Sequence, residues 1–594
     1  MRRTLFPIVL SIVGLLLTSF SLNGIAQKGN PALPGGLLMP EALAGFPGTT
    51  AEWWAAAQDK LVQDLGEAEG LSVVPDWTAV GEASGDVFGY SVAPAGDVNS
   101  DGYADLAVGA WGYDLSSGFN EGKAYVYYGS ASGLNLTPDW SAVGEDTNIY
   151  FGYPVASAGD VNGHGYDDLA VGAPSYNSGT GKVYIYLGSA NGLSITADWS
   201  AIGEAASNYF GQSVSSAGDV NGDGYADLAV GAYLFNTTGK AYVYHGSTTG
   251  LSTIPTWSAV GEDVNNLFGY SVASAGDMNG DGYADLAVGA YGYDIATGKV
   301  YVYHGSANGL SITPNWSVFG ETEDTCFGQS VASAGDVNGD GYADLAAGAP
   351  CLNMPGQDNN GKVYVYHGSV GSLKFTPDWS AVGEGENSYF GESVASVGDV
   401  NGDGYDDLAI GASGYNTSTG KAYVYHGSTN GLSITVDWSA VGEDIYDRFG
   451  YSVASAGDVN GDGYADLVVG AFDFNNIIGK AYNYYGSAGP AGCTVYCLWV
   501  TALDLRDILN GVRGVVSIQD ENGIAVPRAA VSAHWDLPGG GALDQTKITN
   551  TSGSVTFKVA GGAGAYTITV TNVAKTGYTF DPVNSTILTR TITK

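Results

Sequence analysis

A nine-residue polar loop recurs seven times in this chain, and this repetition constrains the fold more than any other feature. Successive loops begin 58 to 63 residues apart, by subtraction of their first positions, which are Asp97, Asp160, Asp219, Asp277, Asp336, Asp399 and Asp458. Self-similarity at a nearly fixed period is typical of small structural units that stack or close into a ring. The chain is therefore expected to repeat one supersecondary unit seven times.

The third copy of the loop, DVNGDGYAD, suggests a metal site. Side-chain oxygens recur at alternate positions, on Asp219, Asn221, Asp223 and Asp227, and Tyr225 can offer its backbone carbonyl. Five oxygens from nine residues suit a hard cation of the size of calcium, and an intervening glycine permits the sharp turn. An Asx-rich hairpin turn without metal is the alternative. Seven copies in register favour calcium.

We therefore predict about seven calcium ions, one per unit. The second loop contains His164 at the third ligand position, and an imidazole in place of a carboxylate predicts the weakest site of the seven. The candidate metal ligands are Asp97, Asn99, Asp101, Tyr103, Asp105, Asp160, Asn162, Tyr166, Asp168, Asp219, Asn221, Asp223, Tyr225, Asp227, Asp277, Asn279, Asp281, Tyr283, Asp285, Asp336, Asn338, Asp340, Tyr342, Asp344, Asp399, Asn401, Asp403, Tyr405, Asp407, Asp458, Asn460, Asp462, Tyr464 and Asp466.

The strongly acidic composition agrees with metal chelation and argues against nucleic acid as a partner. The 594 residues have a formal charge of −40, which leaves no basic surface to meet phosphates. Three Asp in each of seven loops, minus the one replaced by His164, account for 20 of the 61 acidic residues.

The first residues predict export. Arg2 and Arg3 precede an apolar run from Leu5 to about Phe20, and small residues near Ala26 offer a cleavage site. This pattern is that of a secretory signal peptide over residues 1–26, with an uncleaved anchor as the alternative. Residues 27–69 form a leader with a short helix expected at 51–65. We expect a secreted or cell-surface protein with no membrane span after signal cleavage.

Residues 70–487 contain seven units, and each unit has the pattern of four short strands separated by glycine-rich turns. Four-stranded units that repeat without intervening helices predict an all-β fold, a seven-bladed β-propeller. The first unit begins with an outermost strand and the last ends with a third strand, so the N-terminal strand is expected to complete the last blade. A linker at 488–492 leads to a small β-sandwich at 493–594, where apolar and polar residues alternate.

The Phe-Gly pair of each unit, from Phe88-Gly89 to Phe449-Gly450, and the Gly-Ala-Pro at 172–174 and 348–350 resemble FG-GAP repeats. Such repeats build the seven-bladed propeller at the N-terminus of integrin α chains. The resemblance implies an extracellular adhesion or recognition module with ligand bound on one face. Integrin propellers typically have fewer calcium loops, whereas every unit here contains one. The C-terminal region resembles Ig-like or carboxypeptidase-regulatory-like modules.

The units differ mainly in two loops, one before Phe-Gly and one after Gly-Ala, and both should lie on the face opposite the metal loops. These loops vary either because they bind a ligand or because nothing constrains them. Aromatic side chains in exposed loops often anchor ligands. The candidate ligand-binding residues are Trp111, Tyr150, Tyr209, Tyr291, Tyr389, Tyr446 and Phe472, with Leu267 at an equivalent position.

Three function classes remain for such a propeller: an adhesion module, a glycan-binding lectin or non-catalytic targeting module, and a hydrolase. The hydrolase is the least favoured. Arg448 is the only arginine between Gln27 and Ser487, and neither a GxSxG nor an HExxH motif is present. Acids recur in every unit, whereas a catalytic pair should break the symmetry. We predict a protein or glycan ligand, and we expect no catalytic residues.

Two further pairings are expected within units. A Gly-Lys opens each third strand and a Gly-Glu closes each fourth strand, as with Lys240 and Glu262, which predicts an ion pair within each blade. Cys326 and Cys351 lie in two loops of one unit, so that a local disulfide is expected, whereas the pairing of Cys493 with Cys497 stays open.

Four histidines occupy one position of the third strand in four units, namely His245, His304, His367 and His426. A ring of histidines suggests a metal site, but strand spacing of about 4.8 Å places this strand far from the axis, with neighbouring blades over about 10 Å apart. We therefore expect packing residues.

Overall fold

The computed structural model describes residues 70–487, except 73, 116–118 and 372. In the C-terminal region it describes 497–508, 511–519, 528–538, 541–550, 554–560, 565–574, 579–580 and 589–593. The chain divides into two compact units, Met1–Ser487 and Ala488–Lys594. The expected signal peptide, leader helix and linker, together with Cys493, lie outside the described residues.

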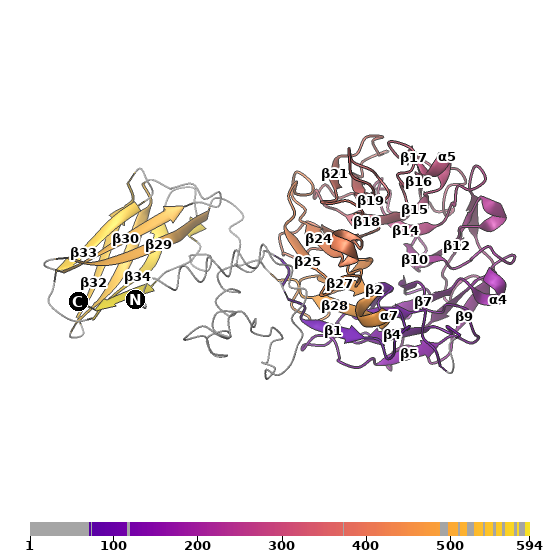
Figure 1. The fold of residues 1–594 in the computed structure, drawn as a ribbon, viewed down its shortest axis with the longest axis horizontal. Coiled ribbons are helices and arrows are strands. Elements are labelled where there is room, and N and C mark those ends of the chain that lie inside the picture. The colour runs from indigo at the N-terminus through magenta and orange to yellow at the C-terminus, as the bar shows by residue number, and fades with distance from the viewer. Residues whose placement is uncertain are drawn as a thin grey trace. The chain divides into compact units, whose positions relative to one another are not determined.

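The first unit is a ring of seven four-stranded antiparallel sheets, which confirms the predicted all-β propeller (Figure 1). In six blades the strands follow one another along the chain from the innermost to the outermost. The inner strands of neighbouring blades lie side by side, as β2 (Ser91–Gly96) does with β6 (Val155–Gly159) and β26 (Ser452–Gly457).

Six blades are each built from four consecutive strands. The first contains β2 (Ser91–Gly96), β3 (Asp105–Ala110), β4 (Lys123–Tyr127) and β5 (Trp140–Val143); the second β6 (Val155–Gly159), β7 (Asp168–Ala173), β8 (Lys182–Tyr186) and β9 (Trp199–Ile202); the third β10 (Ser213–Gly218), β11 (Asp227–Ala232), β12 (Lys240–Tyr244) and β13 (Trp257–Val260). The fourth contains β14 (Ser271–Gly276), β15 (Asp285–Ala290), β16 (Lys299–Tyr303) and β17 (Trp316–Phe319); the fifth β18 (Ser330–Gly335), β19 (Asp344–Ala349), β20 (Lys362–Tyr366) and β21 (Trp379–Val382); the sixth β22 (Ser393–Gly398), β23 (Asp407–Ala412), β24 (Lys421–Tyr425) and β25 (Trp438–Val441).

The seventh blade closes the ring with both ends of the repeat region. It contains β26 (Ser452–Gly457), β27 (Asp466–Ala471) and β28 (Lys480–Tyr484), and its outer strand is β1 (Trp77–Val80) from the start of the repeats. Val80 pairs with Lys480 and Trp77 with Asn483 in antiparallel register. The predicted closure by the N-terminal strand is confirmed.

The position of the second strand in each blade explains why its sequence is continuously apolar. In β11 (DLAVGA) all six residues are buried, because one face packs on each neighbouring blade and both edges are paired. The inner strand β10 pairs with β11 in a register that shifts between Ser216 and Gly218. The same β-bulge recurs in all seven blades, and it directly precedes the polar loop.

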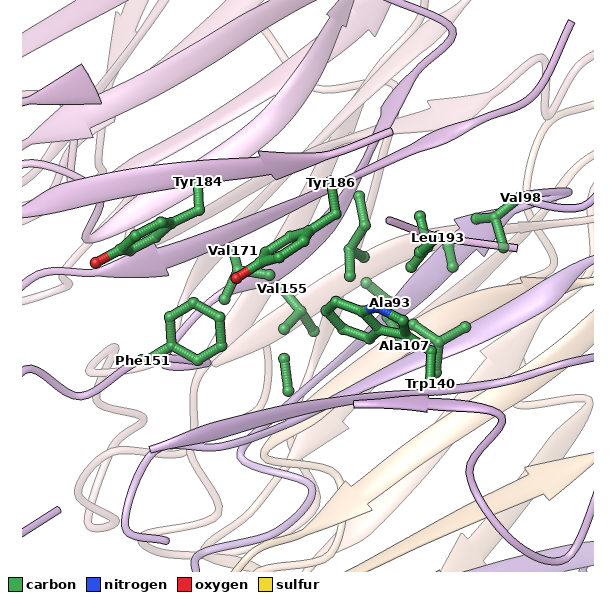
Figure 2. Close-up of a cluster of buried hydrophobic side chains, with 14 of the residues drawn as sticks. Ala93, Val98, Ala107, Trp140, Phe151, Val155, Val171, Tyr184, Tyr186 and Leu193 are labelled. Carbon is green, nitrogen blue, oxygen red and sulfur yellow. The ribbon is translucent and has the colours of Figure 1, made fainter. Parts of the chain in front are cut away.

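The hydrophobic core lies between blades rather than within them. In Figure 2, Phe151 and Tyr184 of the second blade share one cluster with Trp140, Ala93 and other residues of the first. The ring of Trp140 packs edge-on against Tyr186 at 4.8 Å between centroids, and its indole N–H donates to the backbone carbonyl of Ser194. The tryptophan that begins each outer strand thus connects one blade to the next through ring packing and a hydrogen bond.

The Phe-Gly and Gly-Ala motifs arise from a close backbone approach between blades. A Cβ placed on Gly289 of the fourth blade would lie 2.0 Å from the carbonyl oxygen of Gly328, the Phe-Gly glycine of the fifth. Gly328 has a φ of +81°, and its N–H donates to Gly348 of its own blade at 2.9 Å. Only glycine fits on both sides of this contact.

The C-terminal unit consists of two four-stranded sheets that fit a small β-sandwich. One sheet contains β29 (Cys497–Ile508), β30 (Gly511–Gln519), β33 (Ser554–Ala560) and β35 (Thr579–Phe580), and the other β31 (Ala530–Leu537), β32 (Gly541–Ile548), β34 (Ala565–Ala574) and β36 (Thr589–Thr593). Trp535, Phe557 and Ile568 are buried between them. None of the helices in the described part of the chain has the length and apolarity needed to span a membrane.

Candidate functional site

The polar loops connect the first and second strands of each blade and therefore share one end of the propeller. In the third blade both carboxylate oxygens of Asp219 accept backbone N–H groups, from Gly222 and Asp223 at Oδ1 and from Gly224 at Oδ2, at 2.6 to 3.1 Å. Asn221 Oδ1 accepts the N–H of Asp223 at 2.9 Å. These bonds fold the loop back on its own side chains as successive Asx turns.

The last carboxylate of the loop is buried at the base of the blade. Asp227 begins β11 and is fully buried, where its two oxygens accept N–H groups from Val220 at 3.0 Å and Gly246 at 2.8 Å. Burial raises the pKa of Asp227 to about 7, opposed by these two hydrogen bonds and reinforced by the nearby charges of Asp223 and Asp219. Equivalent buried aspartates begin the second strand of the other six blades.

The residues of the loop fit a hard cation in chemistry. Their donors are oxygens, and the buried carboxylate of Asp227 lies close to two further acids with no cationic side chain in ion-pair contact, within the described residues. As arranged in the structure, however, no three Asp, Glu, His or Cys side chains of the described residues converge closely enough to form a metal cage. The calcium ligands thus stay a prediction.

The second loop differs from the other six. His164 Nδ1 lies 3.2 Å from Asp160 Oδ1, and His164 Nε2 lies 3.8 Å from Asp168 Oδ1. The imidazole therefore spans the first and last carboxylates of its loop. Asp167, the residue between Tyr166 and Asp168, points elsewhere, because its Oδ2 accepts the N–H of Asp97 in the preceding blade at 2.9 Å.

The two variable loops of each blade meet at the opposite end of the propeller, as expected from the strand order. The loop after Gly-Ala contains a short helical turn in five blades: α4 (Tyr176–Gly179), η1 (Phe235–Thr237), α5 (Tyr293–Ala296), α6 (Tyr415–Ser418) and α7 (Phe474–Ile477). Residues inside these turns have left-handed backbone angles, such as Asn416 and Thr417 with φ of 48° and 62°. We call this end the loop face.

These left-handed turns form backbone hydrogen bonds with the adjacent blade. The carbonyl of Gly179 accepts the N–H of Tyr209 at 2.7 Å, and the carbonyl of Ser418 accepts the N–H of Arg448 at 2.9 Å. Left-handed residues cost about 1–2 kcal/mol each, so the contact between blades must compensate for them. The variable loops are therefore fixed in backbone while their side chains differ.

The candidate ligand-binding aromatics are less exposed than the sequence suggested. Of the seven, only Tyr446 is exposed, at 60%, and the others are half-buried. The expectation of exposed aromatics therefore holds for Tyr446 alone, and five of the others pack against rings of their own or neighbouring blades. Leu267 is also half-buried.

The rings form two groups on the loop face. The first joins the seventh, first and second blades and contains Trp111, Tyr150 and Phe472 together with Tyr90, Tyr153 and Tyr451. The hydroxyls of Tyr153, Tyr90 and Tyr451 form a chain of 2.7 Å hydrogen bonds. The second group joins the third and fourth blades and contains Tyr209, Tyr233, Tyr270 and Tyr291.

Sequence reasoning missed the residue that follows each Phe-Gly. Tyr90, Tyr153, Tyr270 and Tyr451 occupy this position in four blades, and Glu392 occupies it in the sixth. Burial raises the pKa of Glu392, whose Oε2 accepts a hydrogen bond from the Ser413 hydroxyl. The sequence did contain the signal. Residues that follow the same Phe-Gly motif in every unit must occupy equivalent positions around the propeller axis.

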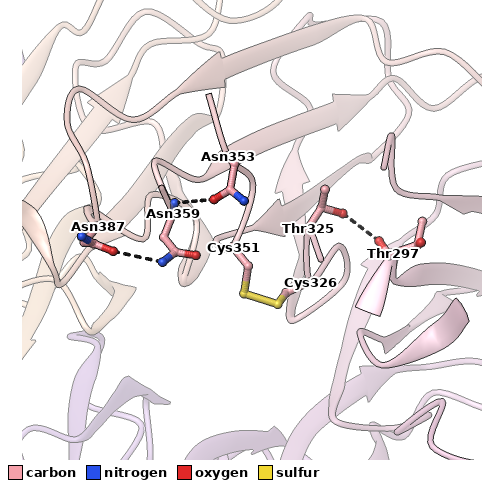
Figure 3. The surroundings of a disulfide bond; sticks show 7 residues. All are labelled: Thr297, Thr325, Cys326, Cys351, Asn353, Asn359 and Asn387. Carbon is pink, nitrogen blue, oxygen red and sulfur yellow. Dashed lines mark hydrogen bonds between the residues drawn. A yellow bond between two sulfur atoms is a disulfide. The ribbon is translucent and has the colours of Figure 1, made fainter. Parts of the chain in front are cut away.

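The fifth blade replaces the left-handed turn with a disulfide. Cys326 and Cys351 are joined, which confirms the expected local disulfide (Figure 3). The same loop is tied to the next blade, where Asn359 Nδ2 donates to Asn387 Oδ1 at 3.0 Å. The disulfide bond thus links the two variable loops of the fifth blade.

The expected ion pairs form between blades, not within them. Lys240 Nζ lies 2.7 Å from Glu204 Oε1 of the preceding blade, and not beside Glu262 of its own. Glu82 likewise pairs with Lys123 at 2.6 Å, whereas Lys480 pairs with Glu443. The glutamate follows the last paired residue of its strand, so that its side chain turns toward the next blade instead of across the sheet.

Three of the four histidines, His245, His367 and His426, pack against neighbouring blades, in agreement with the expectation. A Cβ on Gly309 would lie 3.0 Å from the ring of His245, and one on Gly431 would lie 2.9 Å from His367. Tyr128 approaches Gly192 in the same way. Burial lowers the pKa of His245 and of His304, as expected for neutral packing residues.

Comparison with known proteins agrees with this geometry. The FG-GAP repeat profile matches seven segments, residues 88–127, 151–186, 210–244, 268–303, 327–366, 390–425 and 449–487. Over 214 residues the chain is 36% identical to integrin alpha-V of Gallus gallus and 35% identical to integrin alpha-5 of Xenopus laevis, covering 34% of this chain and 20% of each relative. Over 157 residues it is 41% identical to integrin alpha-6 of Gallus gallus, covering 25% of this chain and 14% of the relative. The chain thus spans about a fifth or less of these relatives.

Proposed function

We propose that this protein, a seven-repeat FG-GAP propeller similar to that of integrin alpha chains, is an extracellular recognition module that binds its ligand on the loop face. The supporting observation is the difference between the two ends of the propeller. The polar loops are nearly the same in every blade, whereas on the loop face aromatic rings from five blades pack into two groups, and the sixth blade has the buried carboxylate of Glu392 at the position after Phe-Gly. Half-buried, pre-packed aromatic surfaces suit protein or glycan ligands, because little side-chain freedom is lost on binding.

Calcium has a structural role in this proposal. An ion bound in a polar loop would neutralise acids that otherwise repel one another, and the aspartates, asparagines and tyrosine carbonyls named above would hold it. The supporting observation is the buried carboxylate that begins the second strand of every blade without a cationic partner among the described residues, except in the second blade. The ions supply charge compensation, and we propose no catalytic step.

Secretion belongs to the same proposal. The N-terminal sequence supports a cleaved signal peptide, and the integrin alpha relatives support an extracellular or cell-surface location. N-terminal sequencing of the exported protein should begin after about residue 26.

A face-blocking experiment tests where the ligand binds. Tyr446→Cys on the loop face and Ile195→Cys at the opposite end are both exposed positions, at 60% and 89%, and each accepts a maleimide-linked polyethylene glycol. Native protein is first screened against a glycan array and an array of purified cell-surface and matrix proteins. Polymer at Tyr446→Cys should abolish the signals found, and polymer at Ile195→Cys should leave them unchanged.

The arrays also separate the two ligand classes. Signals on glycans alone would favour the lectin alternative, which the clustered tyrosines support, and signals on proteins would favour adhesion. Absence of any specific signal, or blockage only from the Ile195→Cys side, would contradict recognition by the loop face.

A further inference from the structure

The second polar loop contains a side chain that the other six lack, and its position is specific. In the third loop Asp223 Oδ1 accepts the N–H of Tyr225 at 3.1 Å, and the five other loops with Asp at this position repeat the bond at 3.0 to 3.1 Å. His164 Nδ1 replaces that oxygen and lies 3.4 Å from the N–H of Tyr166. The imidazole thus enters the loop without changing its backbone.

The ring also bridges the two ends of the loop. Its nitrogens lie 3.2 Å from Asp160 Oδ1 and 3.8 Å from Asp168 Oδ1, and Asp168 is fully buried. Within the described residues, these are the contacts between a basic side chain and carboxylates of the polar loops. The space between the first and last carboxylates, which would hold the ion in the other loops, is therefore spanned by a side chain of the protein.

We propose that the second blade binds no calcium, because the imidazole of His164 stands in place of the ion and joins Asp160 to Asp168. This inference rests on the proposed calcium binding by the other six loops. The propeller then has six ion sites, and in the equivalent position of the second blade the His164 side chain takes the place of the ion. The conformation of the second loop should therefore not change when calcium is withdrawn.

A different mechanism would leave the second loop a weak site: the loop lacks one ligand and water fills the gap. The two mechanisms differ in the effect of removing the ring without supplying another oxygen ligand. If the ring excludes the ion, then His164→Ala opens the loop and creates a seventh site, since Asp160, Asn162 and Asp168 remain. If only a ligand is missing, His164→Ala does not change the number of bound ions.

Calcium stoichiometry of the full-length mature chain, measured by native mass spectrometry during a calcium titration, provides the test. We expect six ions in the native protein, and seven in both His164→Asp and His164→Ala, with the site of the alanine variant filling last. The reciprocal variant Asp223→His in the third blade should reduce the count to five. Circular dichroism confirms that each variant is folded, and His164→Ala alone suffices if Asp223→His is not.

Each outcome decides the matter. Seven ions in the native protein, or six in His164→Ala, would overturn the exclusion of calcium by the ring while leaving calcium binding by the other loops intact. No bound calcium in any variant would overturn the proposed calcium sites and this inference with them.

Discussion

The two ends of the propeller differ in how strongly they constrain the amino-acid sequence. At the polar-loop end every blade repeats one sequence, because each must satisfy its own buried aspartate through the same two backbone N–H groups. At the loop face the backbone contacts repeat, yet side chains at equivalent positions range from Tyr209 to Leu267 to Cys326. The sequence must be the same in each blade where a loop has to satisfy its own buried aspartate. Side chains are free to differ where main-chain atoms make the contact between blades.

The largest expected effect concerns the polar-loop end alone. Removing calcium with a chelator should lower the thermal midpoint of the propeller by on the order of 10–20 °C, since each site at 100 times its Kd contributes about 2.7 kcal/mol. Differential scanning calorimetry in calcium and in chelator measures this. Equal midpoints would mean that the loops are Asx turns without metal, and the repetition of this end would need another cause.

A glycine pair compares the two ends directly. Gly289→Ala at the loop face should destabilise the protein by about 3 kcal/mol, because its Cβ would lie 2.0 Å from the Gly328 carbonyl oxygen. Gly282→Ala in the fourth polar loop, with φ of +89° and no atom within 4 Å of a Cβ, should cost only about 1 kcal/mol. Urea unfolding of both variants gives the values. The reverse order would show that the contact between blades is not what restricts the motif to Gly-Ala.

The fifth blade tests how far a disulfide replaces a left-handed turn. Cys326→Ser with Cys351→Ser removes a cross-link across 25 residues of sequence, which should cost about 2–3 kcal/mol. Since neighbouring blades retain their own contacts, hydrogen exchange should increase first in the variable loops of the fifth blade. Uniform exchange throughout the ring would show instead that the bond stabilises the propeller as a whole.

The sequence was sufficient for the number of blades, their strand order and the closure by β1, because those depend on motifs that recur in register. It was insufficient wherever the identity of the neighbouring blade decides the contact. Spacing alone cannot show that Lys240 meets Glu204 and not Glu262, nor that Tyr209 packs on Tyr233 rather than projecting into solvent. The position of His164 between two carboxylates likewise needed coordinates, since the pattern showed only a missing oxygen.

The smallest predicted effect tests the correction to the ion pairs. Lys240 is mostly buried and its Nζ lies over the Tyr242 ring at 4.6 Å, whereas the Glu204 side chain is 51% exposed. Solvent screening therefore limits the Lys240–Glu204 pair to about 0.2–1 kcal/mol. A double-mutant cycle with Lys240→Met and Glu204→Gln should give this coupling energy. The matched cycle with Glu262→Gln should give none, because that residue pairs with Lys299 of the next blade.

The same cycle has a defined pH dependence. The hydrogen bond from Lys240 lowers the pKa of Glu204 from its usual 4.5, against the opposing effect of burial and with help from Tyr242. A carboxylate with a lowered folded-state pKa stabilises the protein above its unfolded-state value and loses that contribution as pH falls through the folded-state value. The Lys240–Glu204 coupling should thus be constant above about pH 5.5 and decline below about pH 4.5. Lys240–Glu204 coupling that persists at pH 3 would show that the contact is not ionic, whereas coupling of Lys240 with Glu262 at any pH would restore the pairing within a blade.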